Sequence, residues 1–394
     1  MYENGRIEGN AMKQIDVYQL GTKYTAHNEK RVREGYCLGS IAGIWTKDGE
    51  RWRSTVGFAD LAGTRRIEGN TVFRLASMTK PITATAFMQV AESGRIDPDT
   101  PIAAFLPEYE NMSVAYGISG DRVLKSHPAS VLITPRHLLS HSSGLGCGTV
   151  GIAQSKYIKK TASLADSVHA YAASCLDFDP ESNVKYSPIW AFDVLARLVE
   201  MVADMPYEDY LKKYIFDPLG MVDTTYLPSD EQVARCVDFV EQTPHGLVSK
   251  RISPRAGFVG FADGMVCGGA GLFSTLDDYS RFAQMLLNGG SLNGVRILSP
   301  FSMREMTRRQ EIFTAGGFAE NPFGLGMRVC GEPEGDAQPL PKDSYGWSGA
   351  YGTHFWIDVQ NRMACIYMMN LANAGGSDEE AAREFERDVM SSLC

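Results

Sequence analysis

The chain has 394 residues, of which 44% are hydrophobic, and 47 acidic against 38 basic residues give it a formal net charge of -9. This composition can fill a large core, and the charges are spread without a long block of one sign. Disorder is therefore excluded as the default, and nucleic acid and anionic membranes are poor candidate partners. No apolar run reaches the roughly 18 residues of a transmembrane helix, so we expect a soluble globular protein.

The N-terminal segment, residues 1–13, is polar and lacks the apolar stretch and small-residue cleavage site of a signal peptide. We interpret it as a loose leader and expect the protein in the cytoplasm. The eight cysteines include no Cys-x-x-Cys pair. This favours free thiols in a reducing compartment over the disulfides of an exported protein.

Strand patterns occur near both ends of the chain. Residues 39–57 form two β-rich segments around an Asp-Gly turn, which predicts a hairpin. Residues 353–358 and 362–369 repeat the strand, turn, strand pattern. We therefore expect one antiparallel sheet built from both chain ends, with the helical pattern of residues 377–393 packed on it.

Between these strands the pattern is mostly helical. Apolar residues recur at helical spacing in residues 79–93, 134–140, 163–173, 187–203 and 207–214. We predict an α+β protein in which residues 14–76 and 265–394 form a sheet domain with flanking helices. Residues 77–264 would form an inserted, mostly helical domain, with the functional site in the cleft between the two.

The run from Phe73 to Pro81 contains the strongest catalytic candidate. Pro81 has no N–H to donate and is best tolerated in the first turn of a helix, so a helix should begin near Ser77. Ser77 and Lys80 then share one helix face. A serine hydroxyl becomes a nucleophile when a base takes its proton, and a desolvated lysine can be that base. Taken alone, the pair also fits a helix cap followed by a solvated lysine.

Ser77-Met78-Thr79-Lys80 resembles the first motif of the penicillin-recognising serine hydrolases. That group contains class C β-lactamases, D-stereospecific aminopeptidases and β-lactamase-like esterases. Stretches similar to the family follow in its order at residues 137–145, 218–221 and 268–275. The resemblance covers most of the chain and implies a β-lactamase/transpeptidase-like fold. It assigns Ser77 as the nucleophile and Lys80 as the general base.

The family's second motif is Tyr-x-Asn, and the matching stretch is Tyr186-Ser187-Pro188. The resemblance implies that Tyr186 relays protons as general base and general acid. Outside the family context, a tyrosine ahead of a helix is more often a packing residue. Pro188 has no side-chain amide, so it cannot make the substrate hydrogen bond expected of the Asn.

The third motif, Lys-Thr-Gly in β-lactamases, is replaced by Trp347-Ser348-Gly349. The cation is lost, and an indole supplies an apolar wall. A Trp-x-Gly form resembles the esterase branch, which implies substrate contacts from all three residues. The same alignment places the backbone N–H of Ala350 opposite that of Ser77 as the oxyanion hole.

Two other patterns near these motifs are weaker. Gly346-Trp347-Ser348 resembles the start of a nucleophile elbow, but position 350 is Ala and no strand-turn-helix context follows, so we reject that role for Ser348. His354 lies four residues beyond Ala350 on a predicted strand. It should either contact substrate at the cleft edge or pack inside the protein.

Two further motifs are expected to have no catalytic meaning. Residues 146–151 match Gly-x-Gly-x-x-Gly, but no strand precedes them and no clear helix opens on them, which argues against a dinucleotide site. His137 and His141 have the spacing of a zinc-binding helix, yet Leu138 stands where the catalytic Glu would be. We expect structural histidines and no metal or other cofactor.

The sequence therefore predicts a serine hydrolase whose partner is a small-molecule ester or amide. Pro188 lacks the side-chain amide of the family motif and Trp347 lacks the cation, which together favour a carboxylesterase for small or medium esters. Acyl transfer would use the same catalytic residues. β-Lactamase, DD-peptidase or D-aminopeptidase activity is the alternative within enzymes. A non-catalytic binding protein on the same fold is the alternative of another class. The pattern leaves the natural substrate and the oligomeric state open.

Overall fold

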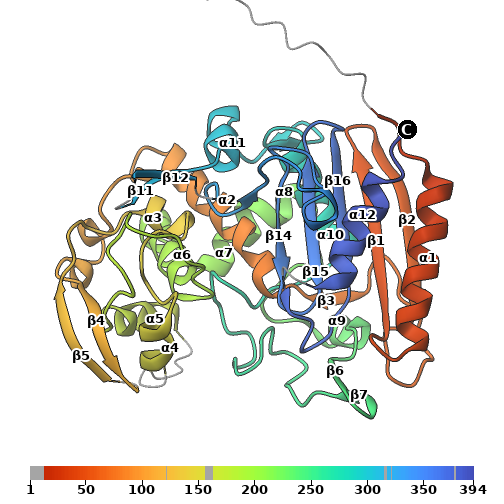
Figure 1. Cartoon of the computed structure of the whole chain (residues 1–394), viewed down its shortest axis with the longest axis horizontal. Coiled ribbons are helices and arrows are strands. Elements are labelled where there is room, and N and C mark those ends of the chain that lie inside the picture. The colour runs from red at the N-terminus through yellow and green to blue at the C-terminus, as the bar shows by residue number, and fades with distance from the viewer. Residues whose placement is uncertain (1–12, 121, 156–162, 315–316, 321, 377–378) are drawn as a thin grey trace, which may run out of the picture.

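The structure is a computed structural model of the chain, and it describes residues 13–120, 122–155, 163–314, 317–320, 322–376 and 379–394. The predicted leader, residues 1–13, lies outside these ranges except for its last residue. Figure 1 shows a sheet covered by helices beside a mostly helical part. Within the described ranges, no helix is long and apolar enough to cross a membrane.

The main sheet has six antiparallel strands in the order β13-β14-β15-β16-β1-β2. Their bounds are β1 Gly39–Thr46, β2 Gly49–Gly57, β13 Arg328–Val329, β14 Tyr345–Gly349, β15 Thr353–Asp358 and β16 Met363–Met368. β1 pairs with β16, with Ile41 opposite Met368. The expected sheet from both chain ends is confirmed.

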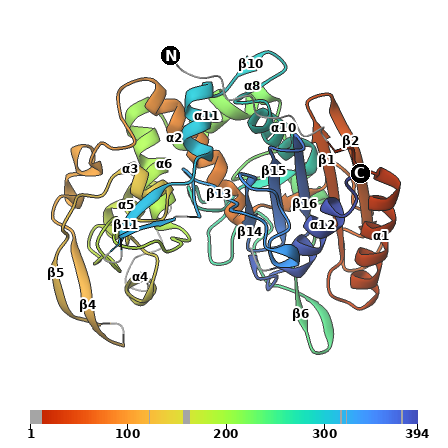
Figure 2. The ribbon, with the colours of Figure 1, turned by 45° about the horizontal axis from the view of Figure 1, so that its top comes forward.

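Helices cover both faces of this sheet (Figures 1 and 2). α1 (Val17–Arg33) and α12 (Glu380–Met390) lie on one face, where Phe385 packs against Trp52 and Trp356. α10 (Leu276–Leu287) lies on the other face, where Tyr279 packs against Phe355. The C-terminal helix is therefore confirmed, although it is shorter than the predicted range of residues 377–393.

The other part of the fold is built around two buried helices, α2 (Thr79–Glu92) and α6 (Trp190–Ala203). The remaining helices are α3 Pro135–Leu139, α4 Thr149–Ser155, α5 Leu164–Tyr171, α7 Tyr207–Leu211, α8 Asp217–Leu219, α9 Asp230–Arg235 and α11 Pro300–Thr307. A π-helical turn, Lys212–Phe216, continues α7. Each predicted helix is present, but α6 begins three residues later than expected, because Ile189 has a non-helical backbone.

Five short strand pairs were not expected from the sequence. They are β3 Val72–Arg74 with β8 Phe273–Thr275, β4 Ser113–Ser119 with β5 Arg122–Pro128, β6 Val240–Thr243 with β7 Gly246–Ser249, β9 Ser291–Leu292 with β10 Val295–Arg296, and β11 Glu311–Thr314 with β12 Gly317–Glu320. The pair β3 and β8 matters for the site. It fixes the segment that leads into Ser77 against the segment that follows the glycine run near residue 270.

The Gly-x-Gly-x-x-Gly segment does lead into a helix, contrary to expectation, since α4 begins at Thr149. The backbone N–H groups of Cys147, Gly148 and Val150 donate to the carboxylate of Asp177 over 3.1, 2.8 and 2.8 Å. The protein's own side chain therefore occupies the anion position of this loop. A nucleotide phosphate has no place there.

Candidate active site

Ser77 lies in a 3₁₀ turn, Ala76–Met78, that runs directly into α2. Ala76 has a φ of 46°, a left-handed conformation that is costly for a residue with a Cβ atom. The turn is held by β14 and β15: the Thr353 hydroxyl donates to the Leu75 carbonyl over 3.0 Å. A Cβ at Gly349 would come within 2.2 Å of that same carbonyl oxygen. Glycine at position 349 thus lets β14 approach the serine turn.

Lys80 is fully buried, at 0% exposure, and its ammonium or amine nitrogen faces three oxygen atoms. Nζ lies 3.2 Å from Ser77 Oγ, 2.6 Å from the Pro188 carbonyl and 2.7 Å from the Gly269 carbonyl. A neutral amine has two N–H groups and one lone pair. An ammonium form donates to all three oxygen atoms, and a neutral form that donates to the two carbonyls has its lone pair free for the Ser77 hydroxyl.

Tyr186 approaches Ser77 from the segment before α6. Its phenol oxygen lies 2.7 Å from Ser77 Oγ. Its ring centroid is 4.9 Å from Lys80 Nζ, so the positive charge of an ammonium form would lie against the ring face. Ser77 Oγ is therefore in contact with both groups that sequence similarity associates with proton transfer.

Pro188 has a backbone role that the sequence did not predict. Its side chain lacks the amide of the family's Asn, but its carbonyl oxygen accepts a hydrogen bond from Lys80. This segment therefore contacts the lysine through its backbone and offers no side-chain amide at position 188.

Trp347 lies in an aromatic cluster beside Tyr186. Its ring stacks on His141 with centroids 5.6 Å apart, and the centroids of Tyr186 and Phe323 lie at 5.8 and 5.5 Å. His141 Nδ1 accepts the Ser187 N–H over 3.2 Å. Burial, and secondly the charge of Lys80, hold the pKa of His141 well below its ordinary value. His141 is therefore a neutral ring with its proton on Nε2, and it supports the indole wall.

A cavity of about 810 Å³ opens beside Ser77. Of the predicted site residues, the structure places Ser77, Tyr186, Trp347, Ser348, Ala350 and His354 in its lining. Lys80 lies behind Ser77, and Gly349 lies against the serine turn, so neither lines the cavity. Pro322, Phe323 and Leu340 add apolar surface to it.

The far part of the cavity wall is polar. Ser348 Oγ lies 2.8 Å from His354 Nδ1, and His354 Nε2 lies 2.9 Å from Glu386 Oε1. Arg383 donates to both carboxylate oxygens of Glu386 over 3.3 and 3.0 Å. Burial would raise the pKa of Glu386, but the His354 hydrogen bond and the charges of His354 and Arg383 outweigh it and lower the pKa below its ordinary value.

The β-lactamase family model matches residues 26–387, nearly the whole chain. The chain belongs to the β-lactamase family. Esterase EstB of Burkholderia gladioli is 27% identical over 390 residues, covering 92% of this chain and 93% of EstB. Acyltransferase calJ of Penicillium decumbens is 28% identical over 347 residues, covering 80% of this chain and 79% of calJ.

Among solved structures, EstCE1, a hydrolase with promiscuous acyltransferase activity, superposes with a TM-score of 0.78 at 22% identity, covering 95% of this chain and 99% of EstCE1. This likeness confirms the β-lactamase/transpeptidase-like α+β fold. The family match and the similarity to EstB confirm a serine hydrolase of the penicillin-recognising family, on its esterase branch.

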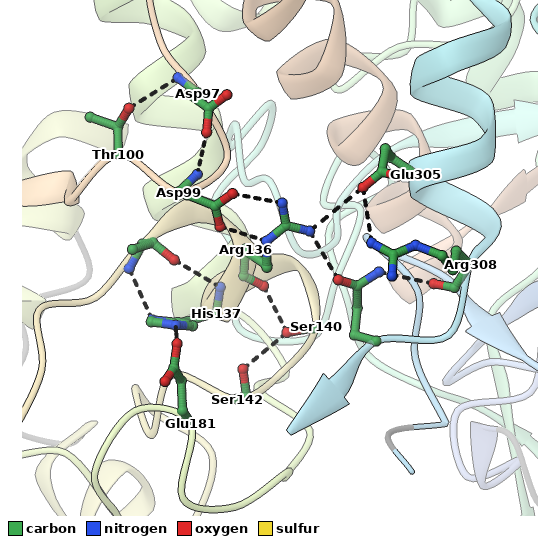
Figure 3. A network of polar contacts seen from close by, with 12 residues as sticks. Asp97, Asp99, Thr100, Arg136, His137, Ser140, Ser142, Glu181, Glu305 and Arg308 are labelled. Atoms are coloured by element: carbon green, nitrogen blue, oxygen red, sulfur yellow. Dashed lines mark hydrogen bonds and ion pairs between the residues drawn. The ribbon is translucent and has the colours of Figure 1, made fainter. Parts of the chain in front are cut away.

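In this β-lactamase-family enzyme, His137 lies in a structural network (Figure 3). Its Nε2 is 2.7 Å from Glu181, and its Nδ1 accepts the Thr134 N–H over 3.1 Å. Beside it, Arg136 donates to both carboxylate oxygens of Asp99 over 2.6 and 2.8 Å. His137 and His141 thus have separate partners. Within the described ranges, no cluster of three metal-binding side chains was found.

Sequence reasoning missed three residues of this β-lactamase-family site. Glu386 and Arg383 lie on α12 and were visible only as part of an acidic, amphipathic pattern. Asp193 lies in the first turn of α6, where a carboxylate among apolar residues was the available signal. Glu386 and Asp193 become site residues through contacts with His354 and Gly268, which are distant in the sequence, and Arg383 through its contact with Glu386.

Proposed function

We propose that this enzyme is a carboxylesterase that forms an acyl-enzyme on Ser77. One observation supports the assignment above the others: Ser77 Oγ lies within hydrogen-bond distance of both Lys80 Nζ and Tyr186 Oη. A serine next to a buried base and a phenol has what nucleophilic catalysis requires. We also propose that the cleft separates a sheet domain, residues 14–76 and 265–394, from a helical domain, residues 77–264.

In acylation, the neutral amine of Lys80 accepts the Ser77 proton as Oγ attacks the ester carbonyl carbon. The backbone N–H groups of Ser77 and Ala350 stabilise the oxyanion of the tetrahedral intermediate. Tyr186 donates its proton to the departing alkoxide and recovers one from Lys80. The alcohol leaves, and the acyl group stays on Ser77.

In deacylation, a water molecule takes the place of the alcohol. Tyr186 accepts a proton from the water as it attacks the acyl carbon, and the phenol proton passes to Lys80. The bond between the acyl carbon and Ser77 Oγ then breaks, Lys80 returns the proton to Oγ, and the carboxylic acid leaves. The cycle needs the lysine neutral at its start. In that state the carbonyls of Pro188 and Gly269 can accept both N–H groups, which leaves the lone pair for the Ser77 proton.

The wall around Ser77 favours neutral, apolar acyl or alcohol groups. Trp347, Phe323 and Leu340 supply apolar surface, and position 347 has no cation to pair with a carboxylate. The similarity to EstB supports the same substrate class. We therefore propose small or medium esters as substrates.

Acyl transfer is a second candidate, favoured by the similarity to calJ and EstCE1. The same acyl-enzyme would pass its acyl group to an alcohol or amine instead of water. Turnover of an ester in the presence of butanol separates the two. A butyl ester among the products supports transfer, and carboxylic acid alone supports hydrolysis.

The decisive test of Ser77 compares wild type with Ser77→Ala on p-nitrophenyl acetate and butyrate. We expect turnover to fall by about a thousandfold or more. Ser130→Ala, at an exposed serine in another loop, is the matched control and should keep wild-type rates. Equal rates in wild type and Ser77→Ala would contradict the proposal.

Two alternatives have their own tests. Cleavage of nitrocefin or D-amino acid amides as efficiently as esters would show a β-lactamase or peptidase instead. A folded protein whose Ser77 does not react with a fluorophosphonate would show a non-catalytic binding protein.

A further inference from the structure

The cavity contains a second serine with a complete set of activating partners. Ser348 Oγ, the His354 imidazole and the Glu386 carboxylate form one chain, with contacts of 2.8 and 2.9 Å. A serine, a histidine and a carboxylate in such a chain make up a familiar nucleophilic arrangement in hydrolases. This hydrogen-bonded set, Ser348, His354 and Glu386, includes none of the groups that contact Ser77.

The protonation states of Ser348 and His354 follow from the charge of Glu386. Glu386 is 1% exposed, and Arg383 and His354 hold it as a carboxylate with a lowered pKa. A carboxylate only accepts hydrogen bonds, so His354 Nε2 must donate to it. In the neutral imidazole, Nδ1 is then an acceptor, and the Ser348 hydroxyl donates to it. Ser348 is thus paired with a base whose orientation Glu386 fixes.

Ser348 is also accessible and has a cation near it. It is half-buried and lines the cavity. Arg328 stands opposite Gly346 in the β13 and β14 pair, so its side chain lies on the same sheet face as Ser348, two residues along the strand. The Arg328 side chain has no hydrogen-bond or ion-pair partner among the described residues, and Arg328 lines the same cavity. It can therefore respond to negative charge that develops near Ser348.

The two serines are approached from different directions. Lys80 and Tyr186 reach Ser77 from α2 and the segment before α6. His354 and Glu386 reach Ser348 from β15 and α12, on the sheet face opposite α10. Removing the Ser77 hydroxyl therefore leaves the Ser348 chain intact.

We propose that Ser348, which the sequence pattern excluded as a nucleophile-elbow serine, is a second nucleophile in this cavity through its contacts with His354 and Glu386, able to react with activated esters and organophosphonates without Ser77. Ser348 Oγ bonds to the electrophilic carbon or phosphorus as its proton passes to His354 Nδ1. The bond to the leaving group then breaks, and the leaving group takes its electron pair and the proton from His354 Nδ1. Glu386 remains a carboxylate throughout, and an acyl or phosphonyl group is left on Ser348.

A fluorophosphonate and tryptic peptide mapping test this proposal. The peptides of interest are residues 75–95, which contain Ser77, and residues 343–362, which contain Ser348. In wild type we expect modification of Ser77 first. In Ser77→Ala we expect modification of Ser348, at a rate at least about tenfold slower than that of Ser77 in wild type.

Two double variants remove the nucleophile or its base: Ser77→Ala/Ser348→Ala and Ser77→Ala/His354→Gln. In each, the rate of labelling in the peptide of residues 343–362 should fall by at least about tenfold relative to Ser77→Ala. Glu386→Gln in the same background should slow it as well. Thermal unfolding checks that each variant is folded. If folded Ser77→Ala stays unlabelled, or is labelled at another residue, the proposal is overturned and the role of Ser77 is unaffected. A wild type unlabelled at Ser77 would overturn the proposed function instead.

Discussion

Lys80 and Asp193 are two buried titratable residues that hydrogen-bond to the same Gly268-Gly269 segment. Lys80 Nζ donates to the Gly269 carbonyl over 2.7 Å, and the Gly268 N–H donates to Asp193 Oδ1 over 2.8 Å. A Cβ at Gly268 would come within 2.0 Å of the Phe192 carbonyl, so only glycine fits against α6 there. Burial raises the pKa of Asp193, and the charge of Lys80 is among the interactions that oppose this rise.

The first prediction concerns the hydrogen bond that Asp193 accepts. Asp193→Ala leaves the Gly268 N–H without its acceptor, so the neighbouring Gly269 carbonyl can shift and Lys80 loses its fixed position beside Ser77. We expect kcat to fall by about 100-fold, with KM changed only a few-fold. Tyr171→Phe removes a 2.8 Å hydrogen bond to Asp193 but keeps the acceptor of Gly268, so it should lose much less. A folded Asp193→Ala with wild-type kcat would count against the coupling.

The second prediction concerns proton transfer by Tyr186. Tyr186→Phe keeps the ring over Lys80 but removes the hydroxyl near Ser77. The value of kcat should fall by about 100-fold to 10,000-fold, with KM changed only a few-fold, because a proton donor and acceptor is lost. Tyr214→Phe, at an exposed tyrosine, is the control. A variant that raises KM and keeps kcat would show a binding role instead.

The third prediction concerns the indole wall. Trp347→Lys restores the cation of the β-lactamase motif and removes an aromatic ring that is 8% exposed. We expect kcat/KM for p-nitrophenyl butyrate to fall by about tenfold or more, since an apolar contact is exchanged for a charge. Trp347→Phe should lose less, because a ring remains against His141. If Trp347→Lys hydrolyses neutral esters as well as wild type does, the indole does not select the substrate.

The fourth prediction concerns stability against pH. Burial raises the pKa of Asp278 from 3.8 to about 6, although its carboxylate accepts hydrogen bonds from the Asp223 N–H and the Thr224 hydroxyl. The folded state therefore binds this proton more tightly than the unfolded chain does. The resulting stabilisation is full below pH 3.8 and is lost as the pH rises through about 6.

This loss corresponds to about 3 kcal/mol in the free energy of unfolding for a shift of this size. Asp278→Asn cannot titrate at this position. Between pH 4 and pH 7, the free energy of unfolding of wild type should therefore fall relative to that of the variant. Urea unfolding at both pH values measures it. A difference that is the same at both would show that Asp278 does not titrate in this window.

The sequence predicted the elements whose signals are local. The hairpin of residues 39–57 has an Asp-Gly turn between β-rich segments, and α12 has apolar residues at helical spacing. The hairpin of β4 and β5 was missed because most of its residues are exposed, so it lacks an alternating apolar face. A bulge near Gly117 further breaks its pattern.

The site was predictable only in part, because some of its contacts join residues that are far apart in the sequence. Ser77 and Lys80 are neighbours on one turn, so spacing alone suggested them as a pair, and family motifs added Tyr186. The contact of His354 with Ser348 depends on the register of β14 and β15. The contact of Glu386 with His354 depends on how α12 docks on the sheet. No local pattern encodes either contact.

The most direct test of the account is the mass of the protein during ester turnover. Wild type is mixed with p-nitrophenyl butyrate, quenched in acid and digested with trypsin, and Tyr186→Phe is treated in parallel to slow release of the acyl group. We predict one butyryl group on Ser77 in the peptide of residues 75–95. Sustained turnover with Ser77 unmodified, together with wild-type rates in Ser77→Ala, would contradict the account.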